Sequence, residues 1–390
     1  MSATAPPVPD DEPISRAPTP LAAILARRIA RDGPMTLADY MAVCLGHSEY
    51  GYYRRNEPFG AAGDFITAPD ISQMFGELIG LWCLEMWNRM GRPDPVLLVE
   101  LGPGRATLLV DALRATRRAR HWHAALRLHL VESSQSLRAR QADALADGTP
   151  VWHSDVSTLP DGPMILLANE FFDALPVRQL VRRDDGGSGW SEMLVALDGA
   201  GRLVCAPAAR ESLLAGTLTE RQRALPVGSI VEVPVAGSAL VAHIAQRLTD
   251  PAGGGVALLV DYGYGEDERD GESSGAALGA TLSAIRRHRH EPILARPGEA
   301  DLSAHVDFSA LARAAAAAGA QTWGPQSQGR FLNQLGIEER ARQLAQAAPA
   351  QVAATIGAAA RLTAAGQMGD LFKVLAIAGP GQAVPPGFDT

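Results

Sequence analysis

The sequence predicts an α/β protein built on a Rossmann-like, mainly parallel sheet, with a helical segment before the sheet and antiparallel and helical pieces added to it. Three observations predict this fold class. The apolar run over residues 96–99 is typical of a strand buried on both faces. From Arg105 onward the apolar residues follow a helical spacing. Between these two segments lies a glycine turn, and the order strand, turn, helix opens a nucleotide-binding β-α-β unit.

The chain before this strand is predicted to form a tail and a helical cap over residues 21–92. Residues 1–20 are rich in proline and acids, so we expect a disordered tail. This tail lacks the apolar core of a secretory signal, and its acids argue against a mitochondrial presequence. Thr67 is the predicted N-cap of one long helix that ends near Met90. Two shorter helices are expected over residues 21–31 and 37–45.

Two interpretations compete for the glycine turn. A dinucleotide-binding turn has the pattern G-x-G-x-x-G, but Thr107 stands at its third glycine position and no phosphate-binding lysine follows. The alternative is the E-x-G-x-G turn of enzymes that bind S-adenosylmethionine. This ligand has no phosphate, and it needs acids for its hydroxyls and its ammonium group, which suits Glu100. Gly102 and Gly104 let the backbone turn tightly and approach a ligand.

Polar residues follow the next predicted strands, which cover residues 126–131, 151–152 and 164–168. Glu132 is placed to accept ribose hydroxyls, and Asp155 is placed to meet an adenine amino group. Asn169 and Glu170 follow the last of these strands. Because ligands bind at the carboxyl ends of parallel strands, we expect Gly102 and these acids to meet in one crevice. For Glu132 and Asp155, helix capping is the alternative role.

The second half of the chain is predicted to leave the sheet and return to it. Residues 178–250 are interpreted as an inserted piece, and residues 251–390 as the remainder of the core with helical additions. The inserted strands are expected over residues 179–182, 190–197 and 203–206, followed by a helix over 238–248. Later elements are a strand over 256–260, a helix over 308–318, helical segments to about 365, and a closing edge strand over 371–378.

Composition limits the classes of partner. The 390 residues include 47% hydrophobic residues, ample for a large core, and the net charge of −8 argues against nucleic acid as a partner. No stretch has the apolar length of a membrane span. The three cysteines are scattered without metal spacing, which suits a reducing cytoplasm. His288 and His290 alternate along the chain, but such a pair lacks the ligand count of a metal site, so no metal is predicted.

Seven motifs together resemble the MidA family of S-adenosylmethionine-dependent methyltransferases. They occur in order through nearly the whole chain. They are YGYY at 50–53, GDFITAPDISQMFGE at 63–77, ELGPGR at 100–105, NEFFDALPV at 169–177, VDYG at 260–263, PGEADLSAHVDF at 297–308 and MGDLFKVL at 368–375. One departure is Ala106, which stands where the family usually has a third glycine. One methyl group there is expected to tighten the turn without closing it.

The resemblance implies a class I methyltransferase sheet and S-adenosylmethionine as cofactor. It also implies that Gly63, Asp64 and Thr67 close over the cofactor. The family includes a mitochondrial arginine methyltransferase that assists assembly of respiratory complex I. For this chain, the resemblance therefore implies a cytoplasmic bacterial relative whose substrate is a protein, with symmetric dimethylation of an arginine on a complex I subunit as the specific expectation. The sequence leaves the oligomeric state open, a homodimer included.

If the methyl acceptor is an arginine side chain, the acids that follow the strand at 164–168 have predicted roles in binding it. Guanidinium is a poor nucleophile, and a carboxylate paired with it can localise its charge and direct one nitrogen at the methyl group. Glu170 is the candidate for this clamp, with Asp173 as a second acid and Asn169 beside them. Helix capping is the alternative role of Asp173. The motif is not the N/D-P-P-aromatic signature of enzymes that methylate bases in DNA.

Two other functions remain open at this point. One is a non-catalytic assembly protein that keeps the methyltransferase fold, for which Ala106 is the suggestive feature. The other is a small-molecule methyltransferase.

Overall fold

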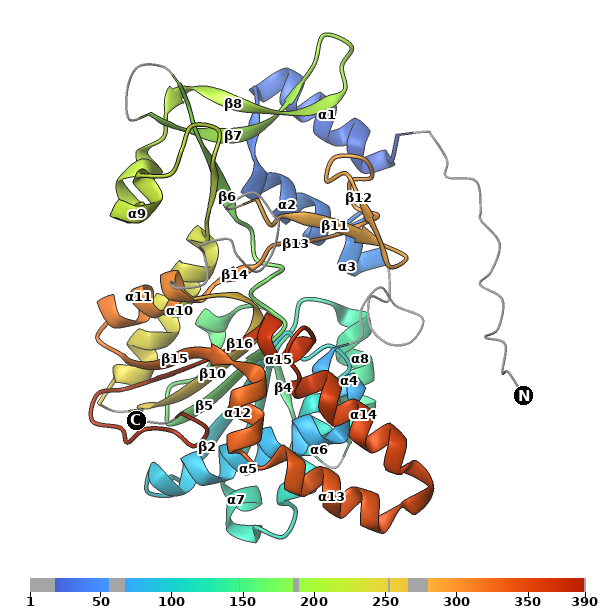
Figure 1. Ribbon diagram of the computed structural model, residues 1–390, viewed down its shortest axis with the longest axis vertical. Coiled ribbons are helices and arrows are strands. Elements are labelled where there is room, and N and C mark those ends of the chain that lie inside the picture. The colour runs from blue at the N-terminus through green and yellow to red at the C-terminus, as the bar shows by residue number, and fades with distance from the viewer. Residues whose placement is uncertain are drawn as a thin grey trace.

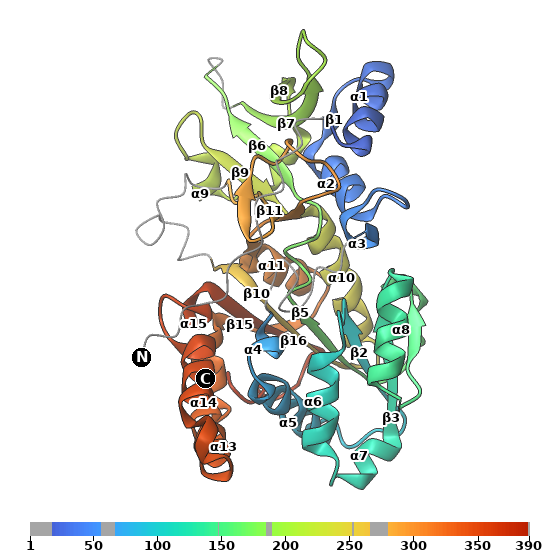
Figure 2. The same cartoon turned by 90° about the vertical axis from the view of Figure 1, so that its right-hand side faces the viewer.

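The computed structural model of the chain describes residues 18–55, 67–146, 148–184, 189–251, 253–265 and 280–388, which form the two lobes seen in Figures 1 and 2. The lower lobe in Figure 1 contains a large sheet covered by helices on both faces, and the upper lobe contains two antiparallel sheets with the N-terminal helices. The predicted α/β class is confirmed.

The large sheet has the strand order β15-β16-β10-β5-β2-β3-β4. Its parallel strands are β2 (Val96–Leu101), β3 (Leu126–Val131), β4 (Val151–His153), β5 (Met164–Asn169) and β10 (Gly255–Tyr264). The short β14 (Val306–Asp307) pairs in parallel with the last two residues of β10. The apolar runs of the sequence form these strands because both faces of the sheet are covered.

The closing strand β16 (Phe372–Ala378) is antiparallel and lies between β10 and β15 (Gln321–Ser327). The expectation that it forms an edge of the sheet is therefore wrong. The edge is β15, in a region predicted to be helical. All seven residues of β16 are buried, whereas those of β15 are half-buried or exposed, as suits an edge.

The two faces of the sheet have separate cores because neighbouring residues of a strand point to opposite faces. In β2, Val96 and Leu98 pack with α5 (Gln73–Arg89) and α6 (Thr107–Thr116). Leu97, Val99 and Leu101 pack on the other face with α10 (Val235–Thr249) and α11 (Phe308–Ala317). Around the sheet lie α7 (Arg120–Ala125), α8 (Gln135–Ala144), α12 (Gln328–Gln334), α13 (Ile337–Ala347), α14 (Val352–Thr363) and α15 (Met368–Leu371). Figure 2 shows α13 and α14 at the side of the lobe opposite α8.

The helix predicted from Thr67 to Met90 is two helices. The chain is extended at Ser72, with a φ of −162°, between α4 (Ala68–Ile71) and α5. The Ser72 hydroxyl accepts a hydrogen bond from the backbone N–H of Met74 and so caps α5, whereas Thr67 makes no such bond to α4. The one-helix expectation was wrong because a serine within an apolar period also suits a cap.

Two glycines let α5 pack closely on α6. A Cβ on Gly76 would lie 2.6 Å from the Cβ of Asp111, and one on Gly80 would lie 2.5 Å from the Cα of Ala112. Larger side chains at these positions would force the helices apart. The helix that begins at the glycine turn is thereby held close to α5 and, through it, to α4.

The upper lobe joins the predicted inserted piece to the first helices. Its larger sheet has the order β1-β7-β6-β9, with β8 paired to β7. Its strands are β1 (Met35–Thr36), β6 (Arg178–Arg182), β7 (Trp190–Leu197), β8 (Leu203–Glu211) and β9 (Ile230–Val233), and the smaller sheet holds β11 (Ser283–Arg286), β12 (Arg289–Glu291) and β13 (Asp301–Ser303). The helices of this lobe are α1 (Pro20–Asp32), α2 (Leu37–Gly46), α3 (Tyr52–Arg55) and α9 (Glu220–Arg223), with a short 3-10 turn at Leu213–Thr217. In the other lobe, 3-10 turns lie at Val156–Thr158, between β4 and β5, and at Pro349–Gln351, between α13 and α14. The region 21–92 is therefore divided, because α1 to α3 belong to the upper lobe and α4 and α5 to the other.

None of the helices among the described residues has both the length and the apolar character needed to cross a membrane.

Candidate active site

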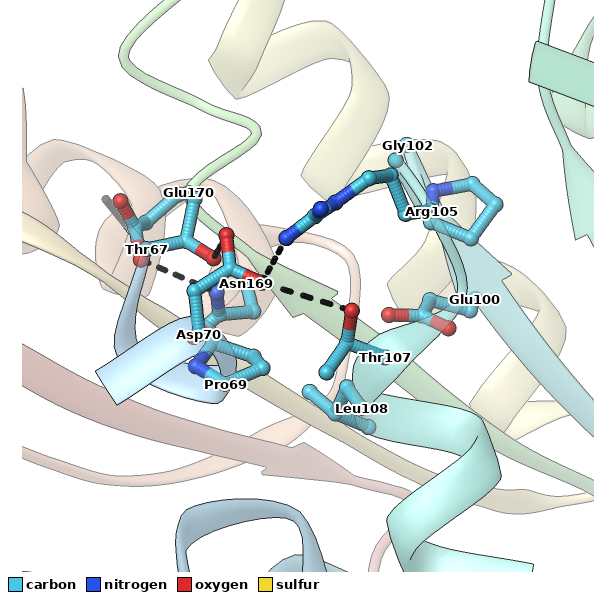
Figure 3. A pocket seen from close by; sticks show the side chains of 12 residues that line it. Thr67, Pro69, Asp70, Glu100, Gly102, Arg105, Thr107, Leu108, Asn169 and Glu170 are labelled. Atoms are coloured by element: carbon cyan, nitrogen blue, oxygen red, sulfur yellow. Dashed lines mark hydrogen bonds and ion pairs between the residues drawn. The ribbon is translucent and has the colours of Figure 1, made fainter. Parts of the chain in front are cut away.

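A pocket lies at the carboxyl ends of β2 and β5, between the start of α4 and the glycine turn (Figure 3). Parallel strands bring their carboxyl ends together at this edge, as the sequence predicts. Six of the predicted site residues line the pocket: Thr67, Glu100, Gly102, Gly104, Asn169 and Glu170. The other lining residues are Pro69, Asp70, Pro103, Arg105, Thr107 and Leu108. Gly63 and Asp64 lie outside the described residues.

The glycine turn has three residues in the left-handed region of the backbone. Gly102 has a φ of 59° and Gly104 a φ of 52°, which glycine adopts without strain. A Cβ at Gly102 would lie 2.8 Å from the ring of Phe171, so this position has no room for a side chain. Ala106 also has a positive φ, of 63°, and is fully buried at the start of α6. The turn therefore keeps the shape of a three-glycine turn at the cost of strain at Ala106.

Glu100 is a buried carboxylate without a complete set of partners. Its side chain is only 3% exposed, and its Oε2 atom has no hydrogen-bond partner among the residues that the structure describes. Burial raises the pKa of Glu100 to about 8. An unsatisfied buried acid at the wall of a pocket is suited to a cationic group of a ligand, which would supply the missing donor.

Asp70 connects α4 to the glycine turn. Its Oδ1 atom lies 2.6 Å from Nη2 of Arg105 and accepts a second hydrogen bond from the Thr107 hydroxyl at 3.4 Å. Its Oδ2 atom accepts a hydrogen bond from the Thr67 hydroxyl at 3.2 Å. The sequence suggests only a first-turn acid at this position, because the partners Arg105 and Thr107 are more than thirty residues away.

Glu170 lies in a strained turn directly after β5. Its φ of 51° places it in the left-handed region, which is uncommon for a residue with a side chain. Oε1 accepts hydrogen bonds from the backbone N–H of Ala68 at 2.9 Å and from Nδ2 of Asn169 at 3.3 Å. Burial raises the pKa of Glu170 to about 8, the Ala68 hydrogen bond opposes the shift, and the nearby carboxyl of Asp173 adds to it. Asn169 Oδ1 is buried and has no partner among the described residues.

Asp173 is buried behind this turn and does not line the pocket. Its Oδ2 atom accepts a hydrogen bond from the Tyr262 hydroxyl at 2.7 Å. Burial raises the pKa of Asp173. No helix follows the turn, so the structure does not give Asp173 the capping role considered as its alternative.

Glu132 lies beside the pocket and is held by its surroundings. Its Oε1 accepts a hydrogen bond from the backbone N–H of Ser134 at 2.7 Å, and its Oε2 lies 3.4 Å from Nε2 of Gln141. Gln141 is fully buried, donates to the carbonyl of Gly104 at 2.8 Å and accepts from the indole of Trp152 at 2.8 Å. Gln141 therefore connects Glu132 to the glycine turn, and the sequence carries no local signal for this role.

Asp155 lies on the surface, apart from the residues that line the pocket. Its carboxylate accepts a hydrogen bond from the backbone N–H of Ser157 at 2.8 Å and caps a 3-10 turn. This is the alternative role considered for it, and the contact with adenine stays a prediction.

Neither His288 and His290, the alternating pair noted in the sequence, nor a third histidine, His305, lines the pocket. His288 and His290 are exposed on the β11–β12 hairpin, and the ring of His305 packs edge-on against Tyr262 with centroids 5.4 Å apart. Within the described part of the chain, no three His, Cys, Asp or Glu side chains are placed to share a metal ion.

Comparison with known proteins shows what this chain is similar to. The sequence model of a family of S-adenosyl-L-methionine-dependent methyltransferases matches residues 78–326. The mitochondrial protein arginine methyltransferase NDUFAF7 of Danio rerio is 35% identical over 347 residues, covering 82% of this chain and 77% of the relative. The Mus musculus protein of the same name is 36% identical over 354 residues, covering 84% of this chain and 76% of the relative.

A solved structure has the same fold. A crystal structure from Burkholderia thailandensis bound to S-adenosyl-homocysteine is similar to this chain with a TM-score of 0.79 and 28% sequence identity. The match covers 95% of this chain and 96% of that chain. The structural match therefore includes both lobes, because only a small part of either chain lies outside it.

Proposed function

This chain belongs to the MidA-like family of S-adenosylmethionine-dependent methyltransferases, and from that premise we propose that it methylates arginine side chains of a protein. The observation that carries the proposal is that two acids, Glu100 and Glu170, line the same pocket. In this proposal Glu100 binds the cofactor and Glu170 binds a cationic acceptor. The curated relatives, which are named protein arginine methyltransferases, support the choice of acceptor.

The residues around the glycine turn fit the cofactor. Gly102 has no room for a Cβ, so main chain forms the pocket wall there, and Glu100 has a carboxylate oxygen with no partner among the described residues. We propose that Glu100 holds the ammonium group, that Glu132 accepts the ribose hydroxyls and that Asp155 meets the adenine. When bound, S-adenosylmethionine supplies an activated methyl group on a sulfonium, so the protein mainly supplies proximity and orientation.

Glu170 and Asn169 offer acceptors for a guanidinium group. Carboxylates bind guanidinium through two parallel N–H···O bonds, and Asn169 Oδ1, which has no hydrogen-bond partner in the described part of the chain, can accept a further N–H. A guanidinium would also relieve the mutual repulsion of the buried acids Glu170, Asp173 and Asp261. The nitrogen that accepts the methyl group must lose a proton. With a pKa raised to about 8, Glu170 is mainly protonated in the free pocket at pH 7, but a bound guanidinium favours its ionised form, and that carboxylate can take the proton.

The finer assignments follow the MidA resemblance. We propose a subunit of respiratory complex I as the substrate protein, symmetric dimethylation as the product, and a cytoplasmic location. Light scattering of the purified protein tests whether it forms a homodimer.

The experiment is incubation of purified protein with radiolabelled S-adenosylmethionine and bacterial lysate, followed by mass spectrometry of the labelled band. We expect a label on arginine of a protein. Glu170→Gln is expected to lose it, whereas Glu85→Gln, which changes an exposed acid paired with Arg89 on α5, is expected to keep it. Label confined to the small-molecule fraction would contradict the choice of a protein substrate.

A second function is favoured by one feature. The strain at Ala106 suits an assembly protein that binds the cofactor without using it, since the buried methyl group stands in the turn itself. Binding of S-adenosyl-homocysteine without labelling of any molecule would support this alternative over the enzyme.

A further inference from the structure

Asp261 is buried at the carboxyl end of β10, the strand beside β5, and is only 1% exposed. Its Oδ2 atom accepts hydrogen bonds from three consecutive backbone N–H groups, those of Phe171 at 3.0 Å, Phe172 at 2.9 Å and Asp173 at 3.2 Å. Its Oδ1 atom accepts one from the backbone N–H of Tyr262 at 2.9 Å. All four contacts use the carboxylate as an acceptor.

These bonds lie directly after Glu170. Three successive N–H groups that converge on one anion define the path of the main chain, because each of them must keep its direction. Glu170 enters this path with a φ of 51° and donates its own N–H to the carbonyl of Val260 at 2.9 Å. A residue with a side chain keeps such a conformation only where its surroundings enforce it. The Asp261 carboxylate is such a group, because it accepts the N–H groups of the three residues that follow Glu170.

The neighbouring residue acts on the side chain of the same turn. The Tyr262 hydroxyl donates to Oδ2 of Asp173 at 2.7 Å, while the Tyr262 ring packs edge-on against Phe372 and His305. Two adjacent residues of β10 therefore hold the main chain and the second acid of the turn. On its other side the turn contacts the glycine turn, because the Phe171 ring fills the space where Gly102 would carry a Cβ.

We propose that Asp261 and Tyr262 are positioning residues for methyl transfer, which keep Glu170 and Asp173 in place relative to the glycine turn. This inference rests on the proposed function, since it assumes that Glu170 receives the acceptor. It goes further in assigning a role to two residues that do not line the pocket. Asp261 and Tyr262 position Glu170 and Asp173, and they make no contact with the cofactor in this proposal.

The first measurement does not depend on activity. Hydrogen exchange of a peptide that covers residues 169–175 is compared between the wild-type protein and Asp261→Asn. An amide keeps one acceptor oxygen but places an N–H₂ against a backbone N–H in either of its orientations, and it removes the negative charge on which the three N–H groups converge. Exchange of the Phe171 to Asp173 amides is therefore expected to become faster. Asp198→Asn is the matched control, because Asp198 also holds a turn by accepting the N–H groups of Ala200 and Arg202, but in the β7–β8 hairpin. It should leave exchange at 169–175 unchanged.

The second measurement is kinetic and is made on the labelled protein substrate. Misplacement of reacting groups by about 1 Å can reduce the rate by about 100-fold, so a loss of kcat of that order is expected for Asp261→Asn. The affinity for S-adenosyl-homocysteine, measured by calorimetry, is expected to stay at the wild-type value. Tyr262→Phe removes only the hydroxyl, and it should also lower kcat while keeping the affinity. This milder variant decides the question if Asp261→Asn does not fold.

Three outcomes overturn the inference: unchanged exchange at 169–175, unchanged kcat at saturating substrates, or a cofactor affinity that falls in parallel with kcat. A wild-type protein that labels no protein at all would refute the proposed function instead. The exchange experiment would then still show whether Asp261 holds the turn.

Discussion

The carboxylate of Asp70 lies 2.6 Å from Nη2 of Arg105, which joins the first turn of α4 to the glycine turn of β2 and α6. Asp70 is nearly buried, whereas Arg105 is 39% exposed. The pair is therefore partly screened by solvent, and its contribution is to the shape of the pocket more than to stability. Both residues line the pocket.

Asp70→Ala is expected to weaken binding of S-adenosyl-homocysteine about tenfold, because about 1.4 kcal/mol is a reasonable loss for a charge-assisted hydrogen bond that shapes a site. Calorimetry of the purified variant measures the affinity. Asp32→Ala is the control, since Asp32 also pairs with an arginine, at 2.7 Å, but both side chains are exposed on α1. Equal affinities in all three proteins would show that the Asp70 contact does not shape the pocket.

The sequence predicts part of the site, because several site residues directly follow the predicted strands in the chain. The apolar runs identify the parallel strands, and the acid or amide after each run lies at the edge of the sheet where the pocket forms. Asp70 and Gln141 were not predicted, since their partners are 35 and 37 residues away and become neighbours only through helix packing. In the sequence Asp261 appears only as part of a family motif. Its partners are main-chain N–H groups, which every residue except proline has, so no pattern of residue types reveals them.

The strands show the same limit. β15 contains Gly324 and Pro325, alternates poorly, and has a shift of pairing between Trp323 and Gln326. An edge strand needs no apolar run, so this segment resembles a loop between helices. Ala106 illustrates the opposite case, in which the sequence shows a departure but only the backbone shows that its φ is 63°.

The strain at Ala106 predicts that Ala106→Gly stabilises the protein. Occupying the left-handed region costs glycine little, while the greater freedom of glycine in the unfolded chain offsets part of the gain, so we expect an increase of up to about 1 kcal/mol in the free energy of unfolding. Denaturant titration measures it. Ala316→Gly, at an exposed position within α11, should instead lower stability by about 1 kcal/mol. The prediction fails if the two substitutions change stability in the same direction.

The pKa of Glu100 predicts that cofactor binding releases a proton. Burial raises this pKa to about 8, so the free site is mainly protonated at pH 7, whereas a bound ammonium group favours the carboxylate. Affinity for S-adenosyl-homocysteine should therefore rise with pH through the interval from 7 to 8 and level off above it. Calorimetry in buffers of different ionisation enthalpy measures up to about one proton released at pH 7. In Glu100→Gln that contribution should vanish. Heats independent of the buffer in the wild-type protein would be incompatible with this role of Glu100.

The stability of the fold against acid is predicted from a pair of histidines on neighbouring strands. His129 Nδ1 in β3 lies 2.8 Å from Nε2 of His153 in β4, and His153 Nδ1 lies 2.9 Å from the Thr158 hydroxyl. Burial lowers the pKa of both histidines, and the neighbouring ring of His153 lowers that of His129 further. Two imidazoles in contact have room for one shared proton but not for two positive charges.

The sign of the effect follows from these directions. A histidine whose pKa is lowered in the folded state binds fewer protons there than in the unfolded state, so its contribution is complete above the unfolded pKa of about 6.5 and is lost as the pH falls. The buried acids Glu100 and Glu170 act oppositely, since their raised pKa values favour the folded state at low pH and cost stability as the pH rises through about 8.

Comparison with a histidine variant separates the contribution of the histidines from that of the acids. In His129→Gln the loss of unfolding free energy between pH 7.5 and about 5.5 should be smaller than in the wild-type protein. His121→Gln, at an exposed position of α7, is the control and should follow the wild-type curve. Parallel curves for all three proteins would mean that the His129–His153 contact does not set the acid sensitivity.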